Sequence, residues 1–159
     1  SGGPQRDAPA TWWSSNILLI GGTVKMPLEH INPKDVFLPR DDTYTMVITS
    51  TGTKHIHLSG VTGKNKDRQF IGDGGMASQV RVTIENIVKM LAAAGAKPSD
   101  VVRMTIYTTD MNLYLKEGDK ERNTYFERSK RPVGTLVEVS RLADPKCLVE
   151  ISAIAVVDS

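Results

Sequence analysis

The sequence predicts an α+β domain, in which two helices cover one face of a mixed sheet. From residue 44 onward, β-rich runs and segments with helical apolar spacing alternate in the order β-β-α-β-α-β-β. The 159 residues are enough to bury one core. The composition, with 40% hydrophobic and 24% charged residues, is ordinary for a globular domain.

The N-terminal region, residues 1–43, is predicted to be an irregular extension of a domain that spans 44–159. Prolines divide the extension into short pieces, among which 17–24 is a candidate strand. Residues 1–3 (Ser-Gly-Gly) resemble the remnant of a cloning tag.

The first regular elements are a hairpin and a helix. The β-rich runs 44–51 and 54–61 flank a short turn that contains Gly52, which predicts a hairpin. The apolar residues of 76–94 recur at helical spacing, and Gly95 is the residue expected to end this helix.

A strand at 101–108 and a second helix at 112–129 come next. The chain then ends in two β-rich runs, 131–142 and 148–157, joined by a turn at 143–146.

Alternation along these last two strands predicts which side chains share a face. One set in the final strand is wholly apolar and is expected to face the helices: Cys147, Val149, Ile151, Ala153, Ala155 and Val157. In the preceding strand the apolar set contains Val133 and Val137. Gly134, Glu138 and Glu150 are therefore predicted to project together from the other face. That face mixes carboxylates with leucine and valine, so we expect it to meet another subunit.

Composition argues against several classes of partner. The formal net charge is only +2, without the clustered basic residues of a nucleic-acid surface. No run approaches the ~20 apolar residues of a membrane span. Cys147 is the single cysteine, so no intramolecular disulfide is possible, which fits a reducing compartment such as the cytoplasm. His55 and His57 alternate on one strand, but no third ligand lies at a suitable spacing, so we expect no metal site.

Five segments resemble a known family in order and spacing: 58–60, 92–96, 100–107, 131–142 and 148–155. On these segments, and over 44–157, the chain resembles the reactive-intermediate deaminase family, also called the YjgF or RidA family. The resemblance implies a chorismate mutase-like fold and a homotrimer around a central barrel. Small-molecule clefts would lie between the subunits. It also implies that no metal or organic cofactor is used.

The well-studied branch of this family hydrolyses imines and enamines, and the resemblance implies roles for particular residues. Glu150 matches a glutamate that holds the attacking water, and Ser59 and Gly60 match a Ser-Gly pair that lines the cleft. Gly134 stands where the family has an arginine that clamps the substrate carboxylate. This chain is therefore identified as a divergent member that lacks the substrate-binding arginine.

The loss of that arginine disfavours the usual deamination of 2-imino acids, because glycine offers no charged, two-point contact. It also enlarges the cleft, which suits a bulkier substrate. Three hypotheses follow: an enzyme acting on another imine, enamine or activated carbonyl compound, a non-catalytic metabolite-binding protein, or a regulatory trimer.

Further residues are expected at the cleft. Thr135 adjoins Gly134 in the strand, and the second contributors are Tyr44, His57 and Tyr125. A carboxylate at position 150 on a partly apolar face would be partly desolvated, which favours a role as general base.

The two glutamates also have structural interpretations. Glu150 could instead pair with Arg103 or Arg141 and hold the trimer together. Glu138 could share the acid–base work or, as we favour, pair with Arg141 or with a partner chain.

Overall fold

The computed structural model describes residues 28–35 and 43–158. Its main sheet has four strands in the order β3-β6-β4-β5. These strands are β3 (Lys54–Thr62), β4 (Val101–Thr108), β5 (Val133–Glu138) and β6 (Val149–Val157). Only the β4–β5 pair is parallel, and the other two pairs are antiparallel. The predicted α+β architecture with a mixed sheet is confirmed.

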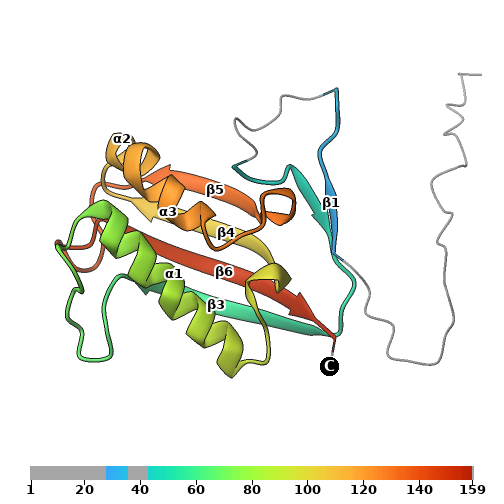
Figure 1. Ribbon diagram of the computed structural model, residues 1–159, viewed down its shortest axis with the longest axis horizontal. Helices are drawn as coiled ribbons and strands as arrows, with labels where there is room; N and C mark the ends of the chain where they lie inside the picture. The colour runs from blue at the N-terminus through green and yellow to red at the C-terminus, as the bar shows by residue number, and fades with distance from the viewer. Residues whose placement is uncertain (1–27, 36–42, 159) are drawn as a thin grey trace, which may run out of the picture.

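The helices lie on one face of this sheet (Figure 1). The long helix α1 (Met76–Ala93) runs along β3 and β6. The remaining helical segments are η2 (Pro98–Asp100), α2 (Met111–Leu113), the π-turn η3 (Tyr114–Gly118), α3 (Asp119–Asn123) and η4 (Arg128–Lys130). None of the helices in the described part of the chain is long and apolar enough to cross a bilayer.

Helix α1 forms where the periodicity predicts it. Its buried residues Val80, Ile84, Ile87 and Leu91 recur every three or four positions and pack into the main core. The helix ends one residue before the predicted limit. Gly95 adopts a φ of +80°, and the Ala96 N–H donates to the Leu91 carbonyl at 2.8 Å, which closes the last turn.

The predicted hairpin is wrong. β2 (Val47–Thr49) pairs with β1 (Glu29–Ile31) in a separate two-stranded sheet, whereas β3 pairs with β6. β3 and β6 are nine residues long and can bury a whole apolar face against α1, which a three-residue strand cannot. β1 also lies within the region predicted to be irregular, while the candidate strand at 17–24 lies outside the described residues.

The second helix is shorter and more broken than predicted. The Asp110 carboxylate accepts from the Leu113 N–H at 2.9 Å and starts α2, and α3 ends at Asn123 rather than continuing to 129. The π-turn between them carries an extra residue per turn, which rotates the phase of the side chains. Tyr114 is consequently fully buried, whereas Leu115 is 58% exposed.

The predicted sharing of one face by Gly134 and Glu150 is also wrong. Residues opposite each other in a sheet point to the same side. Gly134 lies opposite the buried Met104, on the helix-covered face, whereas Glu150 lies opposite the exposed Tyr107, on the other face. We call this other face the open face. Its register positions on β4 and β5 include Tyr107 and Val137, which lie side by side and are 36% and 38% exposed.

Candidate functional site

Glu150 lies on the open face, directly above Gly60. The β3–β6 register shifts between Leu58 and Val61, so that Ser59 and Gly60 form an irregularity in the strand. A Cβ atom at position 60 would stand 1.9 Å from the Glu150 Oε1 atom and 2.7 Å from its Cδ. Only glycine therefore leaves room for the carboxylate in this position.

The surroundings of Glu150 leave its carboxylate available for chemistry. The side chain is half-buried, and Tyr107 is its register neighbour on β4. Within the described residues Glu150 forms no ion pair, so the alternative pairing with Arg103 or Arg141 is absent from the single chain. We call Glu150, Gly60, Ser59 and Tyr107 the Glu150 site.

Glu138 has a different position from the one predicted. It lies on the helix-covered face, and its Oε2 accepts from the Met111 N–H at 2.7 Å. A carboxylate at this point satisfies a backbone donor in the first turn of α2 and complements the helix dipole. Glu138 is therefore a helix cap, and it is remote from any acid–base work with Glu150.

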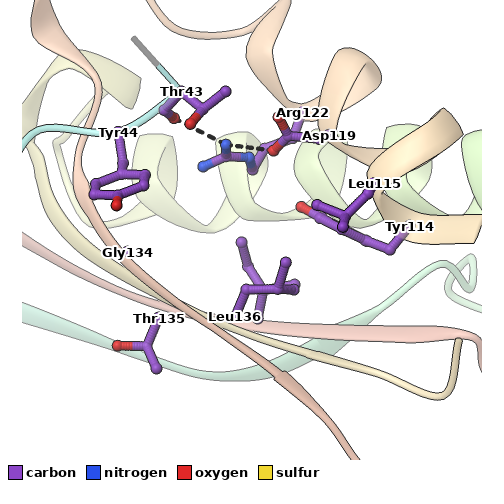
Figure 2. Close-up of a pocket in the computed structure, with 10 residues that line it drawn as sticks. Thr43, Tyr44, Tyr114, Leu115, Asp119, Arg122, Gly134, Thr135 and Leu136 are labelled. Atoms are coloured by element: carbon purple, nitrogen blue, oxygen red, sulfur yellow. Dashed lines mark hydrogen bonds and ion pairs between the residues drawn. The ribbon is translucent and has the colours of Figure 1, made fainter. Parts of the chain in front are cut away.

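A cavity of about 380 Å³ opens beside Gly134 on the helix-covered face (Figure 2). Ile106 and Leu136, which are register neighbours on β4 and β5, form an apolar floor. Residues of η3 and α3 form one wall. No atom lies within 4 Å of the position that a Cβ at Gly134 would take, so the space that a side chain would fill is open. We call this cavity the Gly134 pocket. Its lining is completed by Thr43, Tyr44, Tyr114, Leu115, Asp119, Arg122 and Thr135.

The polar end of the pocket is built around Arg122, a buried residue that is 3% exposed. Its Nη2 donates to the Asp119 Oδ1 at 2.6 Å and to the Thr43 carbonyl at 3.0 Å. Two buried polar atoms here have no partner in the described structure, the Arg122 Nε and the Tyr114 hydroxyl. Burial raises the pKa of Tyr114 well above its ordinary value, so this group remains a neutral O–H donor.

The structure divides the predicted site residues between the two faces. Tyr44 and Gly134 line the Gly134 pocket, whereas Glu150, Gly60 and Ser59 belong to the open face. Thr135 also borders the pocket, but it lies opposite Thr105, in the register of the open face. We call these two groups of predicted site residues the half-sites.

His57 and Tyr125 belong to neither half-site within one chain. His57 is exposed and pairs with Ile154, four residues from Glu150, which is about 13 Å along the strand. The Tyr125 hydroxyl donates to Glu85 of α1 at 3.4 Å. Burial and the nearby Glu85 carboxylate raise the pKa of Tyr125.

Sequence reasoning missed Arg122, Tyr114 and Asp119. Arg122 stands in a run of charged residues, which is typical of a solvated helix face, and the π-turn that turns it inward has no simple sequence signature. The described residues include no cluster of three or more histidine, cysteine, aspartate or glutamate side chains able to hold a metal ion.

The sequence of the chain is similar to those of several named proteins. A RutC family protein of Pyrococcus horikoshii is 45% identical over 83 residues, covering 52% of this chain and 63% of the relative. The 2-iminobutanoate/2-iminopropanoate deaminase of Escherichia coli is 34% identical over 83 residues, covering 51% and 63%. The matches thus span less than two thirds of these relatives.

A solved structure and a family model agree with these sequence similarities. A Rid family protein of unknown function from Yersinia pestis superposes with a TM-score of 0.76 at 23% identity, covering 82% of this chain and 99% of that one. This likeness shows the fold. The family model described as endoribonuclease L-PSP matches residues 40–157. The chain therefore belongs to this family, the YjgF/RidA family that its sequence resembles.

Proposed function

We propose that the protein is a RidA-like enzyme that acts on an imine, an enamine or a related activated carbonyl compound by water addition or proton transfer. The observation that carries this proposal is the Glu150 carboxylate, which overlies Gly60 without an ion-pair partner in the described chain. Family membership and the deaminase name of the Escherichia coli relative support the reaction class.

In the proposed reaction, Glu150 takes a proton from a water molecule as the water oxygen bonds to the imine carbon. The C=N electron pair moves to nitrogen, which takes up a proton from solvent, and a carbinolamine results. Glu150 then returns its proton to the nitrogen as the C–N bond breaks. The hydroxyl group releases its proton to solvent, and a ketone and ammonia leave.

The two half-sites favour a cleft between subunits. Glu150 and Gly134 lie on opposite faces of one sheet, so one chain cannot present both to one substrate. We propose a homotrimer in which the Glu150 site of one subunit faces the Gly134 pocket of its neighbour. The exposed pair Tyr107 and Val137 supports the open face as the assembly surface.

The substrate is expected to differ from a 2-imino acid. Such a compound needs a cation for its carboxylate, and Gly134 supplies no side chain there. We propose a bulkier or less charged imine as the natural type of substrate.

Glu150→Gln tests the catalytic role, with Glu127→Gln as a matched control on an exposed residue. Ammonia release from acetophenone imine, measured above the uncatalysed rate, should fall at least about a hundredfold in kcat for Glu150→Gln and stay unchanged for Glu127→Gln. Full activity of Glu150→Gln would remove Glu150 from the chemistry. Saturable binding without turnover by the wild type would support the non-catalytic alternative.

A further inference from the structure

We propose that the Gly134 pocket selects an uncharged, ring-sized ligand that carries a hydrogen-bond acceptor such as a carbonyl oxygen, and that Arg122 and Tyr114 provide the donors. This inference rests on the proposed function, because it names the class of substrate for the same cleft. Three properties of the pocket support it.

The first property is its charge balance. Arg122 and Asp119 are the charged residues among its described lining, and they pair at 2.6 Å. The guanidinium is thereby neutralised within the protein. A ligand carboxylate brought to this end would lose its hydration and meet the Asp119 carboxylate, without a free cation in the lining to compensate.

The second property is the pair of donors. The Arg122 Nε–H and the Tyr114 O–H are buried and have no acceptor in the described structure. Figure 2 shows the Tyr114 side chain extending from the helical wall toward the middle of the cavity, on the same side as Arg122. Buried donors normally have partners, and a neutral acceptor atom supplied by a ligand would satisfy them without adding charge.

The third property is the shape and character of the remaining wall. Ile106 and Leu136 form an apolar floor, and Gly134 adds open space above β5. A volume of about 380 Å³ is in the range of small-molecule sites. Together these features fit an apolar ring with one acceptor at its polar end.

Three probes of similar size separate the contributions of the acceptor and of its charge to ligand binding. Acetophenone has a neutral acceptor, benzoate has a charged one, and ethylbenzene has none. Their affinities for the full-length protein are measured by ligand-observed NMR titration. Acetophenone should bind about tenfold more tightly than either of the others. Tyr114→Phe, which keeps the ring, should weaken acetophenone binding about fivefold and leave ethylbenzene unchanged. Tighter binding of benzoate than of acetophenone would overturn the proposal. An unchanged ratio of acetophenone affinity to ethylbenzene affinity in Tyr114→Phe would overturn it as well.

A second variant assigns the binding to this cavity. Gly134→Leu places a side chain into space that is empty within 4 Å of its Cβ, so it should fold and lose acetophenone binding at least tenfold. Unchanged binding would show that the probe sits elsewhere and would refute the proposal. Glu150→Gln separates this inference from the proposed function. If that variant keeps full turnover, catalysis by Glu150 is wrong, while Tyr114-dependent binding of acetophenone still supports the pocket.

Discussion

The contact between Gly60 and Glu150 gives the sharpest prediction. In Gly60→Ala, the new Cβ would lie 1.9 Å from the Glu150 Oε1, 2.7 Å from its Cδ and 3.1 Å from its Cγ. The backbone at Gly60 has no positive φ, so alanine is not strained there, and the glutamate side chain must move instead. A shifted rotamer costs about 0.5–1.5 kcal/mol, so the fold should survive. A displacement of about 1 Å in a catalytic group costs about a hundredfold in rate, so kcat should fall by about that factor.

The assay compares kcat on acetophenone imine with the free energy of unfolding in urea. Gly75→Ala is the matched control, because its new Cβ would approach the Asp73 Oδ1 no closer than 3.3 Å. In a double-mutant cycle with Glu150→Gln, Gly60→Ala should add almost no further loss, because both changes remove the same group. Full activity of Gly60→Ala, or losses that multiply in the double variant, would refute the reasoning.

Three further variants test the helix-covered face. Gly134→Arg should raise kcat/KM for 2-iminopropanoate tenfold or more, because an arginine–carboxylate contact contributes about 1.5–3 kcal/mol; no gain would argue against a substrate at this position. Tyr114→Phe should raise the urea unfolding free energy by about 1 kcal/mol by removing a buried hydroxyl without a partner among the described residues. Because burial raises the pKa of Tyr114, this group alone should lower the stability of the wild type by up to about 1.4 kcal/mol per pH unit above about pH 10, and the loss in the variant should be shallower by that amount. Glu138→Ala should lower stability by about 1 kcal/mol in the same urea assay, since the Met111 N–H loses its acceptor; an unchanged value would contradict the capping role.

The parts of the fold that were predictable are those fixed by local periodicity. Helix α1 shows its apolar stripe over about four turns, and Gly95 ends it through a backbone conformation that few other residues adopt. The inward face of β6 follows from strict alternation, and Val149, Ile151 and Ala155 are all buried there. The proximity of Glu150 to Gly60 depends on the register shift in β3, which alternation alone does not predict.

The parts that were not predictable depend on how strands and turns meet in space. Alternation relates residues within one strand, whereas the relation between strands depends on pairing, and β5 pairs with β4 rather than β6. Val133 and Val137 look like core residues in the sequence, yet they lie on the open face, with Val137 38% exposed. In the sequence, Arg122 has the pattern of a solvent-facing helix residue. The π-turn rotates the helix so that Arg122 is buried and forms the polar end of the Gly134 pocket.

The division of the site between two faces makes a mixing experiment decisive. Glu150→Gln keeps an intact Gly134 pocket, and Gly134→Leu keeps an intact Glu150, so each variant alone should be inactive. In an equimolar mixture refolded together, each cleft of the proposed trimer would draw Glu150 from one subunit and the pocket from the next. About a quarter of the clefts would then combine the two intact halves, and about a quarter of wild-type activity should return. A site contained in one chain predicts no recovery, because every chain in the mixture carries one defect. The register places Gly134 and Glu150 on opposite faces of the sheet within one chain. The size of the recovered activity therefore tests whether both residues serve a single substrate.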